Sequence, residues 1–212
     1  MTASNESVAF DTPTREQAAD TFAMWIFIGS EAMLFGAILL VFLIARISYG
    51  PAFAAASHHL SLPLGTLNTI VLISSSFAIA LAHLFARSSR WRAAVWSLAA
   101  TALLGLAFLG IKAAEYTMEF REGVAPVLGA PFTYVGPDPT HAKFFFGLYF
   151  AMTSLHALHL ICGIVVIAGM LAIWSRATQS SRLRRVRAIG LYWHFVDIVW
   201  VFLFPILYLI NR

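Results

Sequence analysis

The chain carries little charge. Only 11% of its 212 residues are Asp, Glu, Lys or Arg, whereas a soluble domain usually carries about 25%. This is too little polar surface to coat a globule in water, which argues against a soluble enzyme, a nucleic-acid binder and a disordered chain. The basic isoelectric point of 9.6 does not favour nucleic acid, because the basic residues lie in short turns between apolar runs.

Cysteine is nearly absent too. A single residue, Cys162, excludes a disulfide framework and a metal site built from several thiolates.

Residues 1–21 lack the apolar core of a signal peptide, so we expect a polar tail there and no cleavable secretory signal.

Long apolar runs account for most of the remaining sequence. Hydrophobic residues make up 60% of the chain, and the mean hydropathy is +0.79. A helix needs about 20 mostly apolar residues to span a membrane, and strands of a β-barrel would alternate apolar and polar residues instead. We therefore predict an all-α integral membrane bundle over residues 22–212. Its five transmembrane helices are expected at about 22–45, 67–86, 93–117, 144–175 and 188–210.

Basic residues predict the orientation of the bundle. Most arginines fall in the tail, in the turn at 87–92 and in the turn at 176–187, which share one side of a five-span chain. The positive-inside rule puts that side in the cytoplasm, so the N-terminus is expected inside and the C-terminus outside, on the periplasmic side. A transporter with inverted repeats usually shows paired halves. The odd number of spans and the absence of visible internal symmetry disfavour one here.

Five ionisable side chains interrupt the apolar runs: Glu31, His156, His159, His194 and Asp197. Each costs at least about 2.5–3.5 kcal/mol in hydrocarbon, so each needs a reason to be there. At 1.5 Å per residue, all five lie in the same slab of the membrane. They can form one polar cluster if their helix faces turn toward one another.

Several roles are open for these groups. Glu31 suits a reactive, protonatable group or a proton relay, and equally a hydrogen bond that only holds helices together. His156 and His159 have the i,i+3 spacing of some metal or haem ligand pairs, but the chain has no Glu-x-x-His motif. The simpler interpretation is that each imidazole hydrogen-bonds a carboxyl or a carbonyl. For Asp197, structural pairing is favoured over proton transfer.

Other polar residues predict smaller features. Lys112 and Glu115 are spaced for an ion pair at the membrane boundary, expected to be solvated. Asn68 and the serines at 74–76 suit hydrogen bonds between helices. The last turn offers four candidates for anionic lipid headgroups, whose simpler role is the orientation signal alone. They are Arg182, Arg184, Arg185 and Arg187.

Five motifs occur in an order that resembles the cytochrome c oxidase subunit 3 family, subunit III of haem–copper terminal oxidases. Together they touch all five spans, and the absence of two further spans resembles the short bacterial form. The motifs are Phe27-Ile-Gly-Ser-Glu31-Ala-Met, Leu67-Asn-Thr with Ser74-Ser-Ser, Lys112-Ala-Ala-Glu115-Tyr116, His156-Ala-Leu-His159 followed by Gly163, and Tyr192-Trp-His-Phe-Val-Asp-Ile-Val-Trp200.

The resemblance implies a non-redox accessory subunit of a proton-pumping oxidase in the bacterial plasma membrane. It implies no catalytic or metal-ligating residue in this chain, with haem and copper in partner subunits. Subunit I is the implied main partner, followed by subunit II, small subunits or a respiratory supercomplex, with bound phospholipid and no nucleic acid. Glu31 falls on the family's carbodiimide-reactive glutamate, linked to proton uptake. The three histidines and Asp197 fall on its other polar positions.

Related complexes leave the electron donor open. Quinol oxidases and nitric oxide reductase complexes have similar five-span subunits. The pairs Ser30-Glu31 and Tyr192-Trp193 resemble the cytochrome c oxidase branch more closely. Two more distant hypotheses are a metal- or haem-binding membrane enzyme built on the histidines and Glu31, and a proton-coupled transporter using Glu31 and Asp197.

Overall fold

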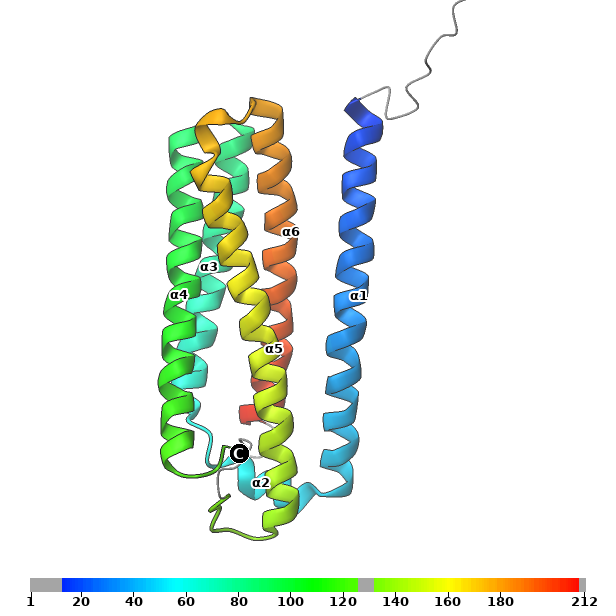
Figure 1. Cartoon of the computed structure of the whole chain (residues 1–212), viewed down its shortest axis with the longest axis vertical. Helices are drawn as coiled ribbons and strands as arrows, with labels where there is room; N and C mark the ends of the chain where they lie inside the picture. The colour runs from blue at the N-terminus through cyan, green and yellow to red at the C-terminus, as the bar shows by residue number, and fades with distance from the viewer. Residues whose placement is uncertain (1–12, 126–131, 210–212) are drawn as a thin grey trace, which may run out of the picture.

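The fold is a bundle of long helices (Figure 1). The computed structural model describes residues 13–125 and 132–209, and every regular element within those ranges is helical. Five of the helices are long and apolar enough to cross a membrane, as the hydropathy predicts. The elements are α1 (Pro13–Ser48), α2 (Gly50–Ser57), α3 (Leu62–Arg87), α4 (Trp91–Arg121), α5 (Pro139–Ala172), the 3₁₀ turn η1 (Trp174–Arg176), α6 (Gln179–Phe204) and the π-helical η2 (Pro205–Leu209).

Most of the helices are longer than the predicted spans. Helix α1 begins at Pro13, within the predicted polar tail, and residues 1–12 of that tail lie outside the described residues. Helix α5 begins at Pro139, before the predicted start at 144, because the Asp138 side chain caps it by accepting from the His141 N–H at 3.3 Å. A helix can extend beyond its apolar run when a polar side chain caps it further out. Hydropathy alone does not detect such caps.

The Asp138 side chain, which lies outside the membrane-spanning segments, also contacts the side chain of His141. Its carboxylate lies 2.6 Å from Nδ1 of His141. Hydrogen bonds from the His141 side chain and backbone lower the pKa of Asp138 below its usual value. The His141 ring in turn stacks on Tyr49 at 3.8 Å between centroids, which ties the start of α5 to the end of α1.

Helices α3 to α6 pack side by side, whereas α1 stands apart from them for much of its length (Figure 1). Helix α2 joins α1 to the bundle at the end where α5 begins. Near that end, Phe42 packs against Phe53 and Phe145 with ring centroids 5.5 and 5.9 Å apart. Phe35 of α1 meets His159 of α5 edge-on, closer to the middle. Aromatic side chains therefore connect α1 to the bundle.

Trp193 joins the four helices of the bundle. It projects from α6 and is fully buried. Its indole N–H donates to the Ser75 hydroxyl on α3 at 3.0 Å. Its ring lies against Gly105 of α4 and Gly163 of α5, where an added Cβ would come within 3.0 Å of ring carbons. The absence of side chains at the two glycines makes room for the ring.

Candidate functional site

Glu31 and His159 form a polar pair between α1 and α5. Glu31 Oε2 lies 2.8 Å from His159 Nε2, and the two side chains are 19% and 13% exposed. His159 Nδ1 lies 2.8 Å from the Leu155 carbonyl oxygen, so Nδ1 carries the proton in that contact. Nε2 then either accepts a hydrogen bond from the carboxylic acid or, when the imidazole is protonated, donates one to the carboxylate. The pair can therefore hold a proton on either side of one short hydrogen bond.

The other intramembrane groups lie elsewhere, so the predicted single cluster is not formed. His156 is fully buried, and its ring packs against Phe108 and Trp200 at 5.4 and 5.1 Å. His194 Nδ1 lies 2.8 Å from the Ser76 hydroxyl on α3. Asp197 is 6% exposed, and neither of its oxygens has a hydrogen-bond partner within the described ranges. Glu31 and His159 lie at the same depth and meet, as predicted. His156 and His194 do not join them, because their side chains point toward other helices, and Asp197 makes no hydrogen bond to either residue of the pair.

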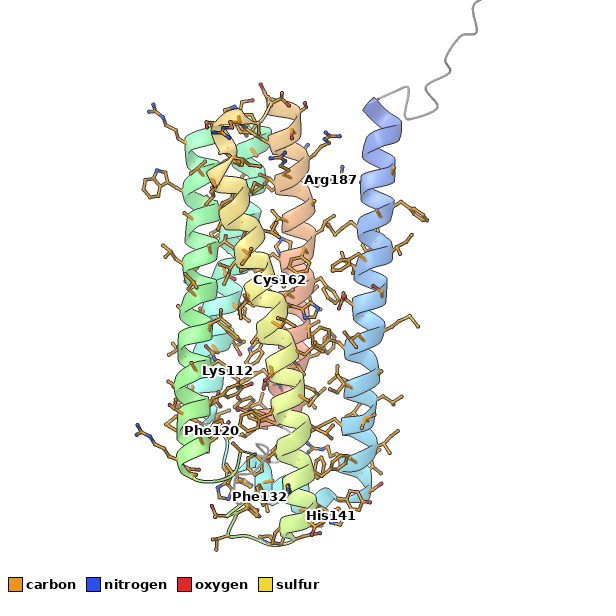
Figure 2. All side chains as sticks on the ribbon, viewed as in Figure 1. Lys112, Phe120, Phe132, His141, Cys162 and Arg187 are labelled. Atoms are coloured by element: carbon orange, nitrogen blue, oxygen red, sulfur yellow. The ribbon has the colours of Figure 1, made fainter. Side chains whose placement is uncertain are left out.

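The expectation of a solvated boundary pair at Lys112 and Glu115 is wrong in its environment. The two side chains lie 2.9 Å apart, but both residues are almost fully buried, at 2% and 1% exposed. Lys112 points from α4 into the bundle (Figure 2), where its ammonium also donates to Tyr149 of α5 and Tyr208 of η2 at 2.8 and 2.9 Å. Tyr208 in turn donates to Glu115 Oε1 at 2.7 Å. We call these four residues the lysine network.

The serines of α3 form hydrogen bonds of two kinds. Ser75 and Ser76 bond to Trp193 and His194 of α6, as described above. Ser74 is exposed and donates to the Ile70 carbonyl of its own helix, so it does not link helices. Asn68 is buried, and neither of its amide atoms has a partner among the described residues.

The arginines around α6 have two different environments. Arg182 donates to the Trp174 carbonyl at 3.0 Å and lies over the Trp91 and Trp174 rings, so it fastens η1 to the bundle. The others line a cleft of about 1040 Å³ between α1 and α6, near the labelled Arg187 in Figure 2. The cleft arginines are Arg87, Arg184, Arg185 and Arg187.

A second, apolar cleft adjoins the first. Its volume is about 520 Å³, and it shares Met24, Phe27, Arg185 and Ala188 with the arginine-lined cleft. Cys162 and Val166 of α5 line its far wall. The two clefts together place a cationic end beside a hydrophobic groove.

No metal-ligand set is assembled in the part of the chain that the structure describes. Within those residues, no three or more His, Cys, Asp or Glu side chains are grouped so that they could hold an ion. His156 and His159, the pair with ligand spacing, turn toward different helices. His159 and His194 make the predicted kind of polar contact. For His156 the predicted hydrogen bond is wrong, because neither of its ring nitrogens has a partner within the described ranges.

Tyr149, Tyr208 and Glu119 escaped the sequence reasoning. A signal existed for Glu119, since positions 112, 115 and 119 share one helix face and predict a polar stripe. Tyr149 and Tyr208 gave no such signal, because a tyrosine in an apolar run resembles any other aromatic residue in a helix interface. Only the packing shows that their hydroxyls meet Lys112.

Comparison with known proteins relates this chain to subunits of respiratory oxidases. A family model described as cytochrome c oxidase subunit III matches residues 13–211, which include all five long helices. A probable quinol oxidase subunit 3 of Staphylococcus aureus (strain USA300) is 28% identical over 209 residues, covering 98% of this chain and 97% of the relative. A protein of the same description from Staphylococcus epidermidis (strain ATCC 35984) matches to the same extent.

Proposed function

This chain belongs to the cytochrome c oxidase subunit III family, and from that premise we propose that it is the non-redox accessory subunit of a proton-pumping haem–copper terminal oxidase. The observation that carries the proposal is the family match across all five membrane-crossing helices. We assign haem and copper to partner subunits, as the resemblance to this family implies. Subunit I is the proposed main partner. The arginine-rich end of the bundle is proposed to lie on the cytoplasmic side of the membrane.

Copurification tests this proposal. We expect a tagged form of the chain, extracted in mild detergent, to bring down a larger haem-containing membrane protein in equimolar amount. The absorption bands of haem in the eluate and the masses of the copurified chains provide the readout. Purification of the chain as a stable monomer free of any haem protein would overturn the proposal.

The electron donor divides the proposal into two candidates. Ser30-Glu31 and Tyr192-Trp193 favour cytochrome c, by their resemblance to that branch. The relatives described as probable quinol oxidase subunit 3, matched over nearly their whole length, favour quinol. The purified complex decides between them when its oxygen consumption is measured with reduced cytochrome c and with a soluble quinol.

We further propose that the two adjoining clefts hold phospholipid. An anionic headgroup fits beside the cleft arginines, where each basic residue near a membrane surface contributes about 1 kcal/mol. Acyl chains fit along the apolar walls formed by Met24, Phe27 and Val166. Quantitative extraction of the purified oxidase measures whether such lipid stays bound through detergent washing.

Glu31 is the proposed proton-linked residue, acting with His159 to support proton uptake by the oxidase. Changing Glu31 to Gln keeps the side-chain size but removes the exchangeable carboxyl proton. We expect the complex to assemble with normal haem content. Proton uptake, or the lifetime of the enzyme during turnover, should change by less than about tenfold, because a group acting directly as acid or base contributes roughly 10²–10⁴-fold.

The matched control for Glu31 is Glu122→Gln, an exposed position at the end of α4, which should leave both measurements unchanged. If Glu31→Gln abolished assembly, the carboxyl would be structural and its assignment to proton uptake would be wrong.

A further inference from the structure

Two carboxyl groups and one ammonium group are enclosed together inside the bundle. Lys112, Glu115 and Glu119 lie on one face of α4, and all three are buried, with Glu119 only 5% exposed. Glu119 lies two residues before the end of α4, on the side of the lysine network toward the loop that leads to α5. The enclosed region therefore has more acidic groups than basic ones.

Within the lysine network, the charges are already matched. The Lys112 ammonium has three protons to donate, and they go to Glu115, Tyr149 and Tyr208 at 2.8–2.9 Å. Glu115 accepts through both of its oxygens, one from Lys112 and one from Tyr208. Nothing in this arrangement leaves Lys112 with a proton to give to a second carboxylate.

Glu119 is left without a partner. Neither of its oxygens makes a hydrogen bond within the described ranges. The titratable and charged groups that face it come from three elements. They are Lys112, Glu115, Tyr116 and Glu122 from its own helix and its cap, Tyr149 from α5 and Tyr208 from η2. The one cation among them is committed to Glu115. An ionised Glu119 would thus add a second, uncompensated negative charge in a buried position, which proteins avoid by neutralising the group.

We propose that Glu119 is a proton-binding site, occupied by one proton in the resting protein and separate from the Glu31–His159 pair. Protonation turns the carboxylate into a carboxylic acid and restores balance to the enclosed groups, with Lys112 and Glu115 remaining as the ion pair. The exposed Glu122 lies three residues further along the chain, at the loop end of the bundle. This inference goes beyond the proposed function and does not depend on it.

Infrared spectroscopy of the purified complex tests the proposal, because a protonated carboxyl has a C=O stretching band separate from that of a carboxylate. We expect the wild-type spectrum minus the Glu119→Gln spectrum to contain one such band. It should move to lower frequency in D₂O and disappear reversibly at alkaline pH. Because Gln is neutral and similar in size, the variant should fold and assemble like the wild type.

Two controls make the assignment specific. Glu122→Gln, which removes a solvated carboxylate nearby, should produce no protonated-carboxyl band in its difference spectrum. Glu119→Asp, which keeps a carboxyl on a shorter side chain, should shift the band without abolishing it and covers the case in which the Gln variant folds poorly. A difference spectrum for Glu119→Gln that shows only carboxylate bands would overturn the proposal.

Discussion

Replacing Lys112 with methionine is expected to destabilise the subunit by about 3–5 kcal/mol, the usual cost of removing one partner from a buried ion pair. The substitution removes three hydrogen bonds at once and leaves the buried Glu115 charge without its cation. Single hydrogen bonds between membrane helices contribute less, about 0.6 kcal/mol on average. The large expected effect therefore comes mainly from the uncompensated carboxylate.

The double variant separates these contributions. Adding Glu115→Gln to Lys112→Met removes both charges, so we expect it to recover at least half of the lost stability. The measurement is the temperature at which the subunit dissociates from the purified complex or unfolds. Lys143→Met, at an exposed position near the start of α5, is the matched control and should change stability by no more than about 0.5 kcal/mol. A Lys112→Met variant as stable as this control would contradict the role given to the lysine network.

Lys112 also shows why the sequence predicts the number of helices better than it predicts which polar side chains meet inside the bundle. Apolar runs determine the number of spanning helices directly, because each helix must satisfy its own backbone in the membrane. A lysine near the end of an apolar run can extend toward the membrane surface or point into the bundle. The sequence of the run is the same in both cases. The inward direction depends on Tyr149 and Tyr208, which lie 37 and 96 residues away along the chain.

The polar groups of α5 and α6 show the same limit. Depth along a helix follows from residue counting, and counting placed Glu31 level with His159 across two helices. The direction of a side chain around the helix axis depends on which neighbours pack there. His159 faces Glu31 of α1, whereas His156 faces Phe108 of α4 and Trp200 of α6, so two histidines of one helix point toward different neighbours.

Replacing Gly163 with leucine is the second change expected to have a large effect, destabilising the subunit by about 3 kcal/mol, at the upper end for overpacking of a core. A Cβ at this position would already lie 3.0 Å from one Trp193 ring carbon and 3.1 Å from a carbon of Tyr192. The neighbouring carbon of the same ring would lie 3.0 Å from a Cβ added at Gly105 of α4, so this end of the Trp193 ring is enclosed by both helices. Moving it would also stretch the hydrogen bond to Ser75.

Gly169 on the same helix is the matched control. A Cβ there meets nothing within 4 Å, and leucine has a better helix propensity than glycine by up to about 1 kcal/mol. Gly169→Leu should therefore leave the dissociation temperature unchanged or raise it. Combining the milder Gly163→Ala with Trp193→Phe should relieve part of the alanine's cost, because the smaller ring frees the space that the Cβ needs. If Gly163→Leu behaved like Gly169→Leu, close packing of the ring against α5 could not be what holds these helices in register, and that role would pass to the polar contacts between α3 and α6.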